Sequence, residues 1–124
     1  MVKPRILIVD DDDTIRELVS MALEDEGYAT AEARHGLEAL AVVRQAPVDL
    51  ILLDMRMPLM DGGEFAQAYH EGPGPHAPII VFSAGRDADD AIARTGAVGY
   101  LPKPFDLAHL LALVAQTVTR SAPA

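Results

Sequence analysis

The sequence lacks cysteine and is poor in basic residues. Because its 124 residues include no Cys, disulfides, cysteine-ligated zinc and thiol catalysis are excluded, and any metal site is expected to use oxygen donors. Ten Lys and Arg stand against 19 Asp and Glu, which gives a net charge of -9. A basic surface for direct nucleic-acid binding and a polybasic membrane patch are therefore missing, and any contact with DNA or RNA would need another domain.

Long apolar runs are also absent. The N-terminal segment has only four consecutive apolar residues, Ile6–Val9, before the acidic block Asp10–Asp13, which is too few for the apolar region of a signal peptide. No segment approaches the ~18 apolar residues of a transmembrane helix. We expect a soluble, cytoplasmic protein with no membrane partner. Its length predicts one domain over residues 1–120, with a tail or the start of a linker at 121–124.

Short apolar segments alternate with amphipathic ones along the chain. The predicted strands are Arg5–Val9, Ala29–Ala33, Asp49–Leu53, Ile79–Phe82 and Val98–Leu101. Most of them are continuously apolar, which is typical of strands buried on both faces of a parallel sheet. The predicted helices carry apolar residues at helical spacing: Ile15, Leu18, Val19, Ala22 and Leu23; Leu37, Leu40 and Ala41; and Leu107, Leu110, Leu111, Val114 and Val118.

Residues that favour helix caps stand at the expected ends of the helices and support this order of elements. Asp12 and Asp13 are interpreted as N-cap or first-turn residues, Asp61 and Glu64 resemble a capping box, and Gly27 and Gly96 stand where C-terminal caps belong. Five strands alternating with five helices predict a doubly wound α/β fold. We expect a (βα)5 three-layer sandwich whose five-stranded parallel sheet has the flavodoxin-like order 2-1-3-4-5.

Polar residues stand at the carboxyl ends of the predicted strands, where doubly wound sheets place their sites. They are Asp10 and Asp11, Asp54, Ser83 and Lys103. Taken singly, the serine is explained as a turn residue and the lysine as a surface residue. Three carboxylates brought together at a buried edge repel one another, however, unless a cation joins them. Mg²⁺ accepts such hard oxygen ligands, and a cation, an ammonium and a hydroxyl together suit phosphoryl transfer.

Four segments in order resemble the receiver domain of bacterial response regulators. They are ILIVDDDD followed by IREL, DLILLDMRMPLMDG, VFSA and GYLPKPF, and the resemblance covers essentially the whole chain. Each segment alone is a weak signal, whereas all four at strand-length spacing are specific. The resemblance implies a phosphorylation-controlled signalling switch that assists its own phosphorylation and dephosphorylation, not an enzyme acting on a separate substrate.

The resemblance also implies a role for each residue of the pocket. Asp54 would be the phosphoacceptor, taking a phosphoryl group from a sensor histidine kinase or a histidine phosphotransfer protein. Mg²⁺, or another divalent cation such as Mn²⁺, would be bound by Asp54, by Asp11 directly, by Asp10 mainly through water, and by the backbone carbonyl of Arg56. Lys103 would pair with Asp54.

Further residues are implied to carry the switch. Ser83 would turn its hydroxyl toward the phosphoryl oxygens, beside the backbone N–H of Ala84. Tyr100 would change rotamer when Ser83 moves. The peptide between Lys103 and Pro104 is expected to be cis. The chain departs from the usual pattern at His35, where Asn is common, and in having Ser83 in place of the more frequent Thr.

The output and the rival functions remain open from sequence. The implied partner is a downstream effector domain or protein, and small residues from Ala88 to Ala97 suit close contact of the face formed by the fourth and fifth helices with a partner or with a second copy, as a homodimer. One alternative is a Mg²⁺-dependent phosphatase or phosphotransferase of the haloacid-dehalogenase type, which would need an acid where this chain has Arg56. The other is an interaction module that is not phosphorylated, although every expected pocket residue is present.

Overall fold

The computed structural model describes residues 3–83 and 88–121, and in them strands and helices alternate from one end to the other. The strands are β1 (Arg5–Val9), β2 (Ala29–Ala33), β3 (Leu50–Asp54), β4 (Ile79–Ser83) and β5 (Gly99–Pro102). The helices are α1 (Asp13–Asp25), α2 (Gly36–Gln45), α3 (Gly62–Glu71), α4 (Ala88–Thr95) and α5 (Leu107–Ser121). All neighbouring strands pair in parallel, in the order β2-β1-β3-β4-β5, so the predicted topology is confirmed.

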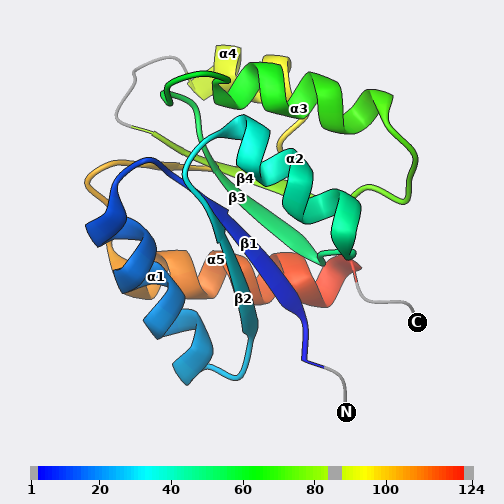
Figure 1. Ribbon diagram of the computed structural model, residues 1–124. Coiled ribbons are helices and arrows are strands. Elements are labelled where there is room, and N and C mark those ends of the chain that lie inside the picture. The colour runs from blue at the N-terminus through cyan, green and yellow to red at the C-terminus, as the bar shows by residue number, and fades with distance from the viewer. Residues whose placement is uncertain (1–2, 84–87, 122–124) are drawn as a thin grey trace.

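The sheet separates two apolar cores. Side chains alternate along β1, so that Leu7 and Val9 pack with α2, α3 and α4, whereas Ile6 and Ile8 pack with α1 and α5. Figure 1 shows these two helical layers on opposite sides of the sheet. Each fully buried aliphatic side chain contributes about 1.5–3 kcal/mol, so the burial of β1, β3 and β4 on both faces fixes the sheet that carries the site.

Strands β3 and β4 both extend one residue beyond their predicted ends, and β5 runs from Gly99 to Pro102 in place of the predicted Val98 to Leu101. Strand β3 begins at Leu50, because the carboxylate of Asp49 accepts a hydrogen bond from the backbone N–H of Arg5 at 2.7 Å and stays exposed. The strand extends to Asp54, which lies opposite Phe82 in β4. Strand β4 likewise extends to Ser83. Both polar residues are therefore held inside the sheet's ladder.

The predicted apolar stripes were wrong at two leucines. Leu18 in α1 is 51% exposed and Leu37 in α2 is 50% exposed. In α2 the buried face is formed by Gly36, Ala39 and Leu40, because the helix begins where Gly36 donates its N–H to a backbone carbonyl of the β3–α3 loop. None of the described helices has the length and apolar character needed to span a membrane.

The predicted helix caps are present. Asp12 is the N-cap of α1, and Asp61 with Glu64 forms a capping box at the start of α3. Gly27 and Gly96 follow α1 and α4 with φ of 94° and 68°, backbone conformations that glycine adopts without steric cost. The caps Asp12 and Asp61 fix the N-terminal ends of α1 and α3 at the carboxyl edge of the sheet, whereas Gly27 and Gly96 end their helices at the opposite edge, before β2 and β5 begin.

Candidate functional site

Asp10, directly after β1, is completely buried. Its Oδ1 accepts the backbone N–H of Asp12 at 2.9 Å, and its Oδ2 accepts a hydrogen bond from Lys103 Nζ at 2.7 Å. Its own N–H donates to the carbonyl of Ala33 in β2 at 3.1 Å. A buried charge is tolerated only when it is paired and hydrogen-bonded, and Asp10 meets both conditions.

Three carboxylates converge at this edge. Asp10, Asp11 and Asp54 each offer an oxygen, and these oxygens lie within 4.8 Å of one another. Within residues 3–83 and 88–121 they are the one group of three acidic, His or Cys residues arranged this way. Neighbouring ligands of one Mg²⁺ are about 3 Å apart, so small side-chain rotations would bring all three oxygens onto one ion. The donor set therefore fits a hard divalent cation.

Lys103 bridges the two buried carboxylates. Its Nζ lies 2.7 Å from Asp10 Oδ2 and 3.4 Å from Asp54 Oδ2, and 5.0 Å from the ring centroid of Phe82. The resemblance implied a pair with Asp54, but the shorter contact is with Asp10. Burial opposes the charge on Lys103, yet the hydrogen bond to Asp10 and the two carboxylate charges raise its pKa above the ordinary value. The expected cis peptide between Lys103 and Pro104 is confirmed.

Asp54 carries a negative charge that its surroundings disfavour. Its carboxyl group is buried and lies beside Asp10, and these two causes raise its pKa from 3.8 to about 6. Lys103 and the backbone N–H of Arg56, which donates to Asp54 Oδ1 at 3.3 Å, lower the pKa without cancelling the rise. An anion held at this position is stabilised by any further positive charge in the pocket.

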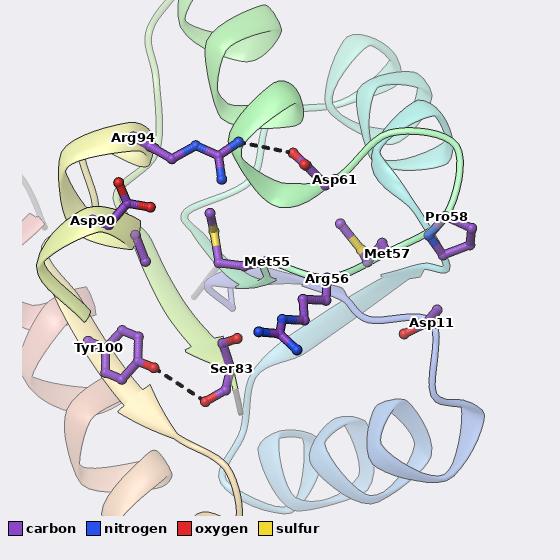
Figure 2. A pocket seen from close by; sticks show the side chains of 11 residues that line it. Asp11, Met55, Arg56, Met57, Pro58, Asp61, Ser83, Asp90, Arg94 and Tyr100 are labelled. Atoms are coloured by element: carbon purple, nitrogen blue, oxygen red, sulfur yellow. Dashed lines mark hydrogen bonds and ion pairs between the residues drawn. The ribbon is translucent and has the colours of Figure 1, made fainter. Parts of the chain in front are cut away.

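Ser83 and Tyr100 form the β4–β5 side of the site. Ser83 ends β4 and is buried. The hydroxyl of half-buried Tyr100 donates to the backbone carbonyl of Ser83 at 3.4 Å, so the predicted switch residues are in direct contact (Figure 2). Ala84, whose N–H was predicted to serve the same site, lies outside the described residues.

A cavity of about 560 Å³ opens between the acidic edge and α4. It is lined by Asp11, Met55, Arg56, Met57, Pro58, Asp61, Ser83, Asp90, Ala91, Arg94 and Tyr100. Figure 2 shows the exposed side chain of Arg56 reaching toward Ser83, while its backbone N–H donates to Asp54 Oδ1. Sequence reasoning did not single out Arg94, whose Nη2 lies 3.6 Å from Asp61 Oδ1. This contact could not be predicted, because Asp61 and Arg94 are far apart in the sequence and no spacing rule relates them.

Comparison with known proteins identifies the family of the chain. Residues 6–115 match the response regulator receiver domain family. The chain belongs to that family. The response regulator MprA of Mycobacterium tuberculosis is 38% identical over 121 residues, which cover 96% of this chain and 52% of that protein. MprA of Mycobacterium leprae is also 38% identical, over 96% of this chain and 53% of its own.

Solved receiver structures have the same fold. The chemotaxis protein CheY4 of Vibrio cholerae superposes with a TM-score of 0.85 at 34% identity, over 94% of this chain and 99% of CheY4. The receiver domain of the Francisella response regulator 1452 gives a TM-score of 0.87 at 29% identity, over 97% of this chain and all (100%) of that one. This receiver domain spans about half the length of the curated relatives it matches.

Proposed function

We propose that this receiver domain of two-component signalling is a switch controlled by phosphorylation of Asp54, working in the cytoplasm. The donor is the phosphohistidine of a sensor histidine kinase or of a histidine phosphotransfer protein. The observation that carries the proposal is the meeting of three carboxylates with the ammonium of Lys103, which lies 2.7 Å from Asp10 and 3.4 Å from Asp54. A buried, partly compensated carboxylate is a poor structural element and a good acceptor of an electrophilic phosphoryl group.

The metal proposed for this pocket is Mg²⁺, or another divalent cation such as Mn²⁺. Asp10, Asp11 and Asp54 would hold it, together with the backbone carbonyl of Arg56. When bound, it supplies positive charge to the phosphoryl oxygens during transfer. The close approach of the three carboxylates is the support for this assignment, since without a cation they repel one another.

The proposed transfer uses an oxygen of Asp54 as the nucleophile. A bond forms between this oxygen and phosphorus while the bond from phosphorus to the donor's imidazole nitrogen breaks. The N–H of Arg56, 3.3 Å from Oδ1, and Lys103, on Oδ2, orient the carboxylate. Lys103 remains beside the group after transfer and offsets part of its charge. Asp54, Ser83 and Lys103 are thus the residues proposed to act in the chemistry.

The proposed output is a two-state change on the β4–β5 side. A phosphoryl group adds a charge of about -1.5 to -2 and three acceptor oxygens, which favours a conformation with the Ser83 hydroxyl turned toward it. Tyr100, bonded to the carbonyl of Ser83, would register that movement. To change the ratio of the active to the inactive conformation from 1:99 to 99:1, the phosphoryl group must bind the active one more favourably by about 5.5 kcal/mol. The surface of α4, β5 and α5 would then meet an effector domain or protein, or a second copy of the chain.

The decisive experiment is phosphotransfer followed by mass measurement of the intact protein. Wild type with Mg²⁺ and a small phosphodonor should gain one phosphoryl group, and Asp54→Asn should gain none. Asp49→Asn is the matched control, because Asp49 is an exposed aspartate at the opposite end of the same strand segment and should label as wild type does. Labelling that persists in Asp54→Asn would refute the assignment. Turnover of phosphomonoesters would favour a phosphatase instead.

A further inference from the structure

One buried charged side chain has no part in the proposed chemistry. Arg16, in the first turns of α1, is only 9% exposed. A guanidinium in such a place must be satisfied by charged or polar partners, because its desolvation is costly and it does not lose its proton. Its partners therefore indicate what the residue is for.

The guanidinium of Arg16 joins three elements of the fold. Nη1 donates to the backbone carbonyl of Asp10 at 2.8 Å, and Nε donates to Glu32 Oε1 in β2 at 3.3 Å. Nη2 pairs with the carboxylate of Asp13 in the first turn of α1. Burial disfavours its charge, but the bonds and charges of Asp13 and Glu32 raise the pKa of Arg16 above its ordinary value.

The bond to Asp10 falls on the peptide that links two predicted metal ligands. The carbonyl of Asp10 and the N–H of Asp11 belong to one planar group, so fixing the carbonyl also fixes the direction in which Asp11 leaves the sheet. The other polar groups of Asp10 are already held by Ala33, Asp12 and Lys103. Arg16 supplies the partner of the carbonyl, the group that orients the next residue.

We propose that Arg16 is a positioning residue for the divalent cation. By holding the Asp10–Asp11 peptide in one orientation, it sets the spacing of the two carboxylates and so the Mg²⁺ affinity of the pocket. This inference rests on the proposed function, because it concerns the same acidic site. Loss of such outer contacts typically weakens metal binding by 10–100-fold.

Charge and position predict opposite results when Arg16 is changed. The guanidinium is a cation beside a cation site, so removing its charge alone would strengthen Mg²⁺ binding. Losing the hydrogen bond that orients the Asp10–Asp11 peptide would weaken Mg²⁺ binding. Lysine keeps the charge but lacks the planar fork that reaches a carbonyl and two carboxylates at once. Under the proposal, Arg16→Lys and Arg16→Met both weaken Mg²⁺ binding, by about 10-fold or more.

The test is a titration of metal-free protein with MgCl₂ at constant ionic strength. Calorimetry measures the Mg²⁺ affinity, and amide NMR measures the change in the signal of Asp11. Unfolding by urea gives the stability of each variant. Ser20→Ala is the matched control, because Ser20 is buried one turn further along α1 and its hydroxyl contacts Glu24 at 3.1 Å and Thr30 at 2.8 Å. Ser20→Ala should lower stability and leave the Mg²⁺ affinity and the amide signal of Asp11 unchanged, whereas Arg16→Lys should change both.

The possible outcomes distinguish failure of the positioning role of Arg16 from failure of the proposed Mg²⁺ site. If wild type binds Mg²⁺ and Arg16→Lys binds it equally well, the positioning role is wrong and the proposed function stands. If Arg16→Met binds Mg²⁺ more tightly, Arg16 acts by charge and the proposal is again overturned. If wild type binds no Mg²⁺, the metal site and the inference both fail.

Glu32→Gln keeps the test decisive if the Arg16 variants do not fold. The Glu32 side chain is 40% exposed, so its replacement is tolerated, and glutamine replaces the charged anchor of the guanidinium with a weaker, neutral acceptor. The expected result is weaker Mg²⁺ binding, with a smaller loss than in Arg16→Lys. Unchanged affinity in this variant would count against the positioning role.

Discussion

The β1–α1 side of the pocket and the β4–α4 side are held in different ways. On the first, Asp10 is fully buried with its polar groups bonded, and α1 buries Arg16, Val19, Ser20 and Leu23. On the second, the eight residues of α4 bury only Ala91 and Thr95. Ala91 packs in the core shared with α3, and the ion pair between Arg94 of α4 and Asp61, the N-cap of α3, joins side chains that are 46% and 35% exposed. The difference teaches that Asp10 is held by buried polar bonds before any ligand arrives, whereas the side assigned to the output is held by a small apolar contact and an exposed ion pair.

Removal of the ammonium that holds the fixed side should have the largest effect. Lys103→Met leaves two buried carboxylates without their cation, which should lower the free energy of unfolding by about 3–5 kcal/mol in metal-free buffer. Urea denaturation measures this loss. Adding Asp10→Asn should restore part of it. Arg34→Met, which breaks an exposed pair with Glu38, should cost less than about 1 kcal/mol.

The pH dependence of the free energy of unfolding should reveal the raised pKa of Asp54. Since its folded pKa of about 6 exceeds the ordinary 3.8, the folded state holds the proton more tightly, and its contribution to stability is lost as pH rises through about 6. Asp54→Asn should therefore stabilise the metal-free protein by about 3 kcal/mol above that pH. Near pH ~4 it should have little effect. Equal effects at both pH values would exclude a raised pKa.

The N-cap of α1 should make a smaller contribution to the fixed side. The carboxylate of Asp12 accepts the N–H groups of Thr14 at 2.9 Å and Ile15 at 3.2 Å. Asp12→Ala should therefore destabilise the protein by about 1 kcal/mol, measured by thermal or urea unfolding. Glu17→Gln, on an exposed position of the same helix, is the control and should change stability by less than about 0.5 kcal/mol.

The weakest expected effect on stability is on the α4 side. Arg94→Met breaks the 3.6 Å contact with Asp61 and should cost about 0.5 kcal/mol or less. Amide hydrogen exchange is the sharper measurement, since a loosely packed element opens locally. Exchange in α4 should become faster while exchange in α1 stays the same. Faster exchange in both helices would mean that the two sides of the pocket are not independent.

Most of the fold follows from sequence because its cause is local. Continuous apolar segments such as Leu50–Leu53 can be buried only between two helical layers, and caps such as Asp61 and Glu64 act within a few residues. The meeting of Asp10 with Asp54 also follows, because parallel strands end at one edge.

Side-chain partners across the fold could not be predicted in the same way. Lys103 lies nearer Asp10 than Asp54 by a margin that depends on the path of the chain after β5. Arg16 reaches Glu32 on another element, and the apolar spacing that marks α1 says nothing of such a contact. Leu18 and Leu37 were expected in the core because helical spacing gives the width of an apolar stripe but not its centre.

Gly62, at the start of α3, allows the helix to pack closely against the backbone of Asp54. A methyl group at this position would stand 2.6 Å from the carbonyl oxygen of Asp54 and 2.9 Å from Cα of Met55, both of them backbone atoms. Strand β3 cannot retreat, because it is hydrogen-bonded to β1 on one side and β4 on the other. Even alanine there would force α3 outward, so the absence of a single carbon atom lets a helix pack directly against the residue that we propose as the phosphoacceptor.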